Sequence, residues 1–215
     1  MPNKREMRSL VNYGEPINTT WLFDQGFTNV LHARYWTSTS FTALYPDRAF
    51  AVNLPYGYTS DYEQYKDEFH EYSWPVRGGH GIYSAPADLP QTGQTTNYSA
   101  GDDGALRKGA PWPYPRFSNH GNGTITDNLT GLMWTQDGQP SILSACTPSA
   151  TMTWQDALAH VACLNTHSHL GYTNWRVPNV IELESVVNSE YGSTTDWLGL
   201  QFNRPECRKD SKGVI

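Results

Sequence analysis

The chain repeats one phrase near both of its ends, and this repeat constrains its fold more than any other feature. Residues 2–12 read PNKREMRSLVN, and residues 178–188 read PNVIELESVVN, 176 positions later. The register extends further, because Trp21 and Trp197 keep the same offset. A constant offset is the signature of an internal repeat. The residues between the copies do not repeat, so we expect the back half of one structural unit followed by the front half of the next.

Each copy of the phrase predicts a short helix. Asn3 and Asn179 are favourable N-caps, and Glu6 and Glu182 stand three residues later, where they complete capping boxes. Apolar residues follow at helical spacing in both copies. A single folded unit has a place for only one such helix. We therefore expect one copy to occupy it and the other to lie at the periphery or to fray.

The rest of the pattern predicts short strands and one longer helix. β-branched, aromatic or alternating residues favour strands over residues 33–41, 48–54 and 70–77. Residues 116–134 predict a β-meander with glycine and asparagine turns, and Thr153 is the expected N-cap of a helix. The residues expected on the buried side of that helix are Trp154, Ala157, Leu158, Val161, Ala162 and Leu164.

Composition excludes several classes of protein. The formal net charge is −6 and no basic run is present, which argues against nucleic acid as a partner. No apolar stretch reaches the length that membrane insertion requires. The hydrophobic content of 38%, with 18 Gly and 14 Pro, is typical of a loop-rich globular domain. Cys146 and Cys163 are candidates for a disulfide, which would leave Cys207 unpaired.

Five sequence blocks resemble one family. They are residues 123–134, 153–158, 174–179, 35–39 and 74–79. In this set they resemble the Lcl C-terminal domain-like family, named for a collagen-like bacterial adhesin. The resemblance implies an α+β, C-type-lectin-like fold with small antiparallel sheets and two or three short helices. It also implies a bacterial protein.

The order of the blocks differs from that of the family, because the last two blocks come first. We therefore expect a circularly permuted domain, in which two halves pack together. The alternative is a homo-oligomer in which copies exchange halves. The predicted divisions are the back half 1–79, a linker 80–114, the front half 115–203 and a disordered tail 204–215.

A tyrosine-rich segment is the leading candidate for a ligand-binding surface. Tyrosine with short polar residues provides rigid contact area and adaptable hydrogen bonds, as in antibody paratopes. The alternative is a hydrophilic loop whose tyrosines pack on the sheet. In C-type-lectin-like folds, long late loops commonly form the ligand surface, and the resemblance implies the same here. The candidate residues are Tyr56, Tyr58, Asp61, Tyr62, Gln64, Tyr65 and Asp67.

Other candidate sites have simpler explanations. His160, Cys163 and His167, with His169 nearby, have the spacing of zinc ligands on one helical face, but a structural Cys163 and surface histidines explain the same residues. Residues 120–124, with Asp127 and Asn128, offer oxygen ligands for calcium, but a polar turn explains them as well.

Catalysis has little support in the sequence. Ser38 and Ser40 lie in a predicted strand with no histidine or aspartate tied to them by spacing. Formylglycine-generating enzymes share the implied fold, but their cysteine pattern is not matched here. The sequence predicts a non-enzymatic, extracellular or cell-surface module without a cofactor or metal, which binds a surface glycan or protein. The alternatives are a structural unit of a tandem-repeat surface protein and an enzyme of the formylglycine-generating type.

Overall fold

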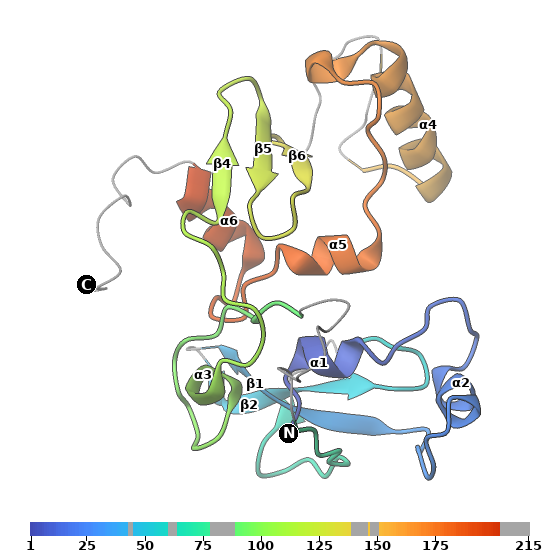
Figure 1. Ribbon diagram of the computed structural model, residues 1–215, viewed down its shortest axis with the longest axis vertical. Helices are drawn as coiled ribbons and strands as arrows, with labels where there is room; N and C mark the ends of the chain where they lie inside the picture. The colour runs from blue at the N-terminus through green and yellow to red at the C-terminus, as the bar shows by residue number, and fades with distance from the viewer. Residues whose placement is uncertain (43–44, 60–63, 78–88, 139–145, 147–150, 203–215) are drawn as a thin grey trace. The chain divides into compact units, whose positions relative to one another are not determined.

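The described residues form an α+β structure of two compact units (Figure 1). Unit 1 contains residues 1–112 and 187–199, and unit 2 contains residues 113–186 and 200–215. The α+β prediction is confirmed. The C-type-lectin-like fold, the circular permutation and the packing of the two halves into one domain stay predictions. The computed structural model describes residues 1–42, 45–59, 64–77, 89–138, 146 and 151–202.

Each unit contains one three-stranded antiparallel sheet, with the order β1-β2-β3 in unit 1 and β4-β5-β6 in unit 2. The elements of unit 1 are α1 (Lys4–Arg8), α2 (Asn18–Asp24), β1 (Arg34–Thr42), β2 (Tyr45–Asn53), β3 (Gln64–Tyr65) and α3 (Asp103–Leu106). Those of unit 2 are β4 (Phe117–Asn119), β5 (Thr124–Asp127), β6 (Met133–Thr135), α4 (Trp154–Thr166), η1 (His169–Gly171) and α5 (Val180–Ser185). The last helix, α6 (Thr194–Phe202), contains the boundary between the units.

The core of unit 1 lies between α1 and the long β1–β2 pair (Figure 1). Met7 is 1% exposed and packs in one cluster with Tyr35, Val52 and Leu54. The alternation predicted for residues 48–54 understates the burial, because Ala51 of the opposite face is also fully buried. We call the α1-contacting side of the pair the helix-binding face; its residues are Tyr35, Phe50, Val52, Leu54 and the adjoining Trp112.

Polar contacts fix α1 on this face. The Ser38 N–H donates to the Pro2 carbonyl at 2.8 Å, and the Lys4 N–H donates to Thr39 Oγ1 at 3.0 Å. The Lys4 ammonium lies 4.7 Å from the centre of the Phe50 ring. Such cation–π contacts stabilise by about 0.5–2 kcal/mol. The helix is therefore held at its first turn as well as by the burial of Met7.

Arg5 joins α1 to segments that are distant in sequence. Its guanidinium donates to the Gln91 carbonyl at 2.7 Å and to the Val187 carbonyl at 2.9 Å, and it lies over the Trp112 ring. The Trp112 indole N–H donates to the same Gln91 carbonyl. Trp112 is half-buried and its ring packs against that of Trp197.

The segment interpreted as a linker, residues 80–114, is folded into unit 1 over residues 89–112, while 80–88 lie outside the described residues. The Gln94 side chain makes two hydrogen bonds with the Ser40 backbone. Asp103 is 2% exposed and accepts from the Thr39 and Thr92 hydroxyls, and burial raises the pKa of its carboxyl. Polar contacts attach this segment, so a hydrophobic pattern could not reveal it.

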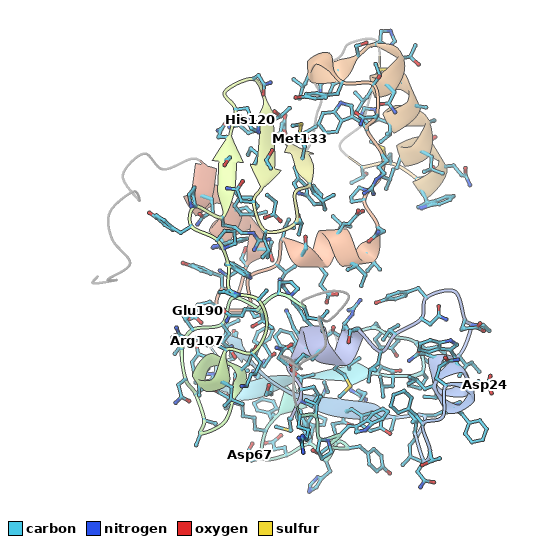
Figure 2. The ribbon with its side chains drawn as sticks, viewed as in Figure 1. Asp24, Asp67, Arg107, His120, Met133 and Glu190 are labelled. Carbon is cyan, nitrogen blue, oxygen red and sulfur yellow. A yellow bond between two sulfur atoms is a disulfide. The ribbon has the colours of Figure 1, made fainter. Side chains whose placement is uncertain are left out.

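Glu190 and Arg107 hold residues 95–96 between them (Figure 2). The Glu190 carboxylate accepts from the Thr95 and Thr96 N–H groups at 2.7 and 3.0 Å. The Arg107 guanidinium donates to the Thr95 carbonyl at 3.0 Å. These contacts, with the bond from the Ser189 N–H to the Thr92 carbonyl, place residues 187–199 in unit 1.

The two copies of the repeated phrase fold with the same local hydrogen bonds. Each has a capping box, a serine hydroxyl that donates to the carbonyl three residues earlier, and an asparagine side chain that accepts from the N–H two residues later. In the first copy the pairs are Asn3–Glu6, Ser9–Glu6 and Asn12–Gly14. In the second copy they are Asn179–Glu182, Ser185–Glu182 and Asn188–Glu190.

The two copies differ in burial. Met7 is 1% exposed, whereas its counterpart Leu183 is 50% exposed. Val180 and Ile181 are 45% and 50% exposed, and α5 has no buried residue. The first copy thus packs on a sheet, whereas the second exposes its apolar residues.

The meander over residues 116–134 and the helix capped by Thr153 are confirmed. The predicted strand over residues 70–77 is wrong, because only one bridge forms there, between Tyr35 and Tyr72. The predicted buried side of α4 is also largely wrong: Trp154 is 67% exposed, and Leu164 is the one buried residue of that helix. An apolar stripe shows which residues share a face and does not show that another element covers it.

We expect Met7→Ala to lower the free energy of unfolding of unit 1 by about 2–5 kcal/mol, because it removes a buried side chain and leaves a cavity. The matched change Leu183→Ala should cost less than about 1 kcal/mol, because Leu183 is half exposed. Urea unfolding of both variants and the wild type measures the difference. Equal losses in the two variants would contradict the different burial of the copies.

Candidate functional site

Three exposed tyrosines gather at one end of the β1–β2 pair in unit 1. Tyr13, Tyr56 and Tyr58 are 47%, 61% and 49% exposed. The rings of Tyr56 and Tyr58 are parallel within 2°, with centroids 6.2 Å apart. We call these three residues the tyrosine shelf. Exposed aromatic rings in a fixed arrangement offer flat apolar contact area with a hydroxyl at the edge.

A tight turn after β2 positions the shelf. Gly57 has φ +74°, and a Cβ added there would meet the Val11 side chain, so only glycine fits. The Gly57 N–H donates to the Asn53 carbonyl at 2.7 Å, and the Asn53 N–H donates to the Tyr58 carbonyl at 2.9 Å. The turn therefore brings Tyr56 and Tyr58 onto the same side.

The third tyrosine is held by the stretch that follows α1. The Tyr13 hydroxyl donates to the Gly57 carbonyl at 3.4 Å and accepts from the Arg8 guanidinium. The guanidinium also lies over the Tyr13 ring, 5.8 Å from its centre. Both the ring and the hydroxyl of Tyr13 thus have fixed neighbours although nearly half of the side chain is exposed.

A hollow of about 130 Å³ adjoins the shelf. This volume is well above the roughly 10–15 Å³ that a single water requires. Its walls combine rings with amide and carboxylate groups, and its volume is below the roughly 300–1,000 Å³ of pockets that hold drug-sized ligands, so it suits one part of a ligand. The lining residues are Val11, Asn12, Tyr13, Glu15, Pro16, Asn18, Pro55 and Tyr56.

Asn18 lines this hollow and has an unused buried donor. Its residue is 1% exposed, and its Oδ1 accepts from the Asn12 N–H at 2.9 Å, which fixes the orientation of the amide. Its Nδ2 is buried and finds no acceptor among the residues that the structure describes. An unsatisfied buried donor costs about 1–3 kcal/mol.

The structure brings together only part of the predicted tyrosine-rich surface. Tyr56 and Tyr58 are exposed neighbours, whereas Gln64 is 2% exposed within β3. Tyr65 packs under Arg48, whose guanidinium lies 4.3 Å from the Tyr45 ring centre and 4.6 Å from that of Tyr65. Asp61 and Tyr62 lie outside the described residues, and Asp67 is exposed in the loop after β3.

Sequence reasoning missed Tyr13, Glu15 and Asn18, which complete the site from the stretch after α1. No spacing in the sequence marks these three residues, whose counterparts in the second copy of the repeat are Ser189, Tyr191 and Thr194.

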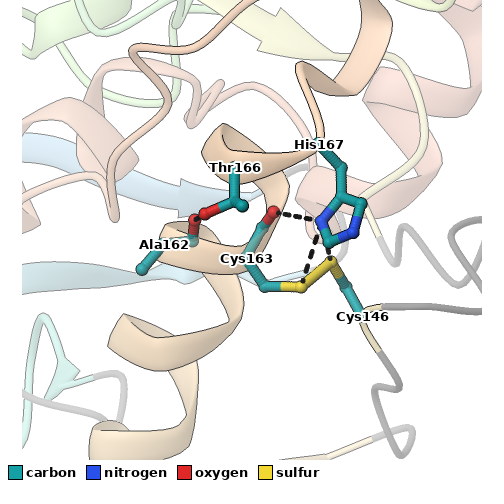
Figure 3. Close-up of a disulfide and its surroundings, with 5 residues drawn as sticks. All are labelled: Cys146, Ala162, Cys163, Thr166 and His167. Atoms are coloured by element: carbon teal, nitrogen blue, oxygen red, sulfur yellow. Dashed lines mark hydrogen bonds between the residues drawn. A yellow bond between two sulfur atoms is a disulfide. The ribbon is translucent and has the colours of Figure 1, made fainter.

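A disulfide joins Cys146 and Cys163, with His167 beside it (Figure 3). His167 Nδ1 lies 3.7 and 3.6 Å from the two sulfurs and 3.0 Å from the Cys163 carbonyl. These three residues form a cluster of possible metal ligands, and His160 and His169 are not part of it. Because the two sulfurs are bonded to each other, neither offers the thiolate that a zinc ligand or a catalytic cysteine requires.

The turn considered for calcium is a self-contained structural site in unit 2. Asp127 is fully buried and pairs with Arg116, with Oδ1 2.6 Å from Nε and Oδ2 2.8 Å from an Nη. Asp127 also accepts from the Leu129 N–H and the Thr130 hydroxyl. Both carboxylate oxygens of Asp127 therefore already accept hydrogen bonds from Arg116 and from the turn, which explains these residues without calcium. Arg116 donates as well to the Ser185 carbonyl, which ties the last turn of α5 to this sheet.

The surroundings of Asp127 favour its charged form. Burial alone would raise the pKa, but the hydrogen bonds from Arg116, Leu129 and Thr130 hold the pKa of the carboxyl below its ordinary value. The pKa in the folded state is thus lower than in the unfolded chain. The ion pair therefore stabilises unit 2 above the unfolded pKa of about 3.9, and this contribution is lost as the pH falls towards the folded value.

We expect Arg116→Met to cost about 3–5 kcal/mol at neutral pH, because it leaves a buried carboxylate without its cation. The matched change Arg176→Met removes the exposed partner of Glu182 and should cost far less. The Arg116→Met penalty should shrink as the pH falls below about 4 and Asp127 becomes neutral. Urea titrations at pH 7 and pH 3 measure both effects. A penalty that does not depend on pH would contradict the assignment.

Comparison with known proteins supports the resemblance for part of the chain. No curated protein matches the chain, and no solved structure matches it. The described helices are all too short or too polar to span a bilayer. Residues 123–205 match the model of the Lcl C-terminal domain family, which confirms the predicted family over that stretch and indicates a bacterial surface-associated domain.

Proposed function

We propose that this chain is a non-enzymatic, extracellular ligand-binding module, and that the tyrosine shelf with its hollow in unit 1 is the binding site. The observation that carries the proposal is the parallel, exposed pair Tyr56–Tyr58 beside a hollow with an unused buried donor. Rigid aromatic rings with few polar groups at fixed positions are typical of binding sites.

A surface glycan fits these features better than a protein epitope does. The C–H face of a pyranose ring is apolar and flat and can stack on a tyrosine, while its hydroxyls both donate and accept. The Asn18 Nδ2 requires an acceptor, and the Glu15 carboxylate at the same hollow accepts from hydroxyl donors. A site that offers both a hydrogen-bond donor and a hydrogen-bond acceptor is suited to a hydroxyl-rich ligand.

The proposal of a binding role also accounts for the groups considered for catalysis. Ser38 and Ser40 are 5% and 1% exposed within β1, so neither can reach a substrate. Cys146 and Cys163 are joined. A disulfide is also consistent with the proposed extracellular location, because disulfides persist in oxidising compartments.

A second candidate is a structural module that spaces other domains and has no ligand. The identical capping boxes and turns of the two repeat copies favour it, because such devices serve folding and not recognition. The two candidate functions make different predictions for the tyrosine shelf. In a structural module the exposed rings of Tyr56 and Tyr58 would contact no ligand.

We expect the double variant Tyr56→Ala, Tyr58→Ala to lose roughly tenfold or more in affinity for its glycan, because the truncated rings are central to the site. The measurement is binding to an array of bacterial and host surface glycans, with surface proteins included, followed by titration of the glycans that the wild type binds.

Tyr114→Ala is the matched control, because Tyr114 is 98% exposed and belongs to unit 2. It should bind as the wild type does. Equal binding by the wild type and the double variant would reject the tyrosine shelf. A wild type that binds no glycan or protein on the array would favour the structural module.

A further inference from the structure

The apolar face of α5 lacks a cover among the described residues of unit 2. Val180, Ile181 and Leu183 are each about half exposed on a helix of six residues. Both ends of the helix are fixed, because Asn179 and Glu182 form the capping box and the Ser185 carbonyl accepts from Arg116. The helix is therefore formed and anchored while its apolar residues face outward.

The first copy of the repeat shows what covers such a helix. α1 has the same capping box, the same serine bond and the same asparagine turn, and it lies on the helix-binding face of the β1–β2 pair. By the repeat offset, Leu183 corresponds to Met7, Ile181 to Arg5 and Val180 to Lys4. The surface complementary to α5 is thus a face of this kind.

We propose that α5 is a second ligand for the helix-binding face, and that copies of this chain associate when α5 of one copy replaces α1 on the β1–β2 pair of another. The partner is therefore a second copy of this chain. Exchange of equivalent elements between copies is a common route to dimers.

The residues of α5 suit the positions they would take. Leu183 is apolar and similar in volume to Met7, which it would replace beside Val52 and Leu54. Val180 and Ile181 would lie over the rings of Phe50 and Trp112, where α1 places two cations.

Some bonds of α1 can be remade by α5, whereas the bond from the Arg8 guanidinium to Thr59 Oγ1 is lost, because Glu184 stands at that position. The backbone N–H of Lys4 donates to Thr39 Oγ1, and the backbone N–H of Val180 could donate to it in the same way. The Gln91 carbonyl, which loses Arg5, keeps the Trp112 indole as a donor at 2.7 Å. The Val187 carbonyl does lose its bond from Arg5, so α1 is the better ligand for the face within one chain.

Because α1 binds the helix-binding face better than α5 does within one chain, association of two copies depends on the release of α1. Association requires a copy whose helix-binding face is free, so the apparent affinity equals the intrinsic affinity multiplied by the fraction of copies with α1 released. A change that weakens α1 should strengthen association. The same change in α5 should weaken it. The repeat provides this matched pair of substitutions at its two N-caps, Asn3 and Asn179.

The test is sedimentation velocity of the full chain over a concentration series, with Cys207→Ser in every form to exclude intermolecular disulfides. Loss of an N-cap shifts a helix equilibrium by roughly fivefold. Asn3→Ala should therefore lower the dimer dissociation constant by roughly fivefold. Asn179→Ala should raise it by a similar factor. Leu183→Asp added to Asn3→Ala should restore the monomer.

Three results would overturn the proposal: an unchanged mass for Asn3→Ala at every concentration, the same shift for Asn3→Ala and Asn179→Ala, or association that survives Leu183→Asp. Near-UV circular dichroism checks that each variant keeps its fold. If Asn3→Ala does not, Arg5→Ala releases α1 by another route, because it removes the bonds to the Gln91 and Val187 carbonyls. The same three criteria then apply to it.

Discussion

One helix covers the β1–β2 pair, while the sequence encodes two helices of the same design, and this constraint organises the molecule. The helix-binding face is filled once α1 has buried Met7 against Val52 and Leu54. Apolar burial is worth roughly 25 cal/mol per Å², so whichever copy lies on the face gains most of what this phrase can contribute. The other copy keeps its local hydrogen bonds and leaves its apolar residues exposed. Caps determine that both copies are helices, and contact with a sheet determines which one belongs to a core.

The same distinction explains how far the sequence predicts this fold. Both capping boxes, the meander over residues 116–134 and the N-cap at Thr153 depend on residues at most a few positions apart, and all three were predictable. The burial of α4 was not, because the pattern identifies a stripe and contains no information about a partner for Trp154 or Leu158. The strand expected over residues 70–77 failed for a related reason: alternation favours a strand, but this segment pairs with β1 at one bridge only, between Tyr35 and Tyr72.

The contacts of buried polar residues were harder to predict from the sequence than the helices and strands. Residues 89–112 have the composition of a linker, yet Thr92, Gln94 and Asp103 are buried there. Gln94 and Asp103 bond to β1, and Thr92 bonds to Asp103. Buried polar residues must find partners, and those partners are fixed only by the tertiary structure. The same applies to the candidate site. Tyr56 and Tyr58 were identified from composition, whereas the burial of Gln64 and the role of Asn18 depend on contacts that no spacing in the sequence encodes.

A comparison of the two repeat copies separates scaffold from site. Asn3, Glu6, Ser9 and Asn12 recur at the 176-residue offset with the same hydrogen bonds, so they serve the local fold of the phrase wherever it occurs. Arg8, Tyr13, Glu15 and Asn18 do not recur, since Glu184, Ser189, Tyr191 and Thr194 take their places. Those four belong to the tyrosine shelf and its surroundings, whereas Val11 and Asn12, which also line the hollow, do recur as Val187 and Asn188. The hollow therefore combines residues of the shared scaffold with residues that only the first copy has. The scaffold residues determine the local backbone, and the residues specific to the first copy determine which polar groups and rings border the hollow.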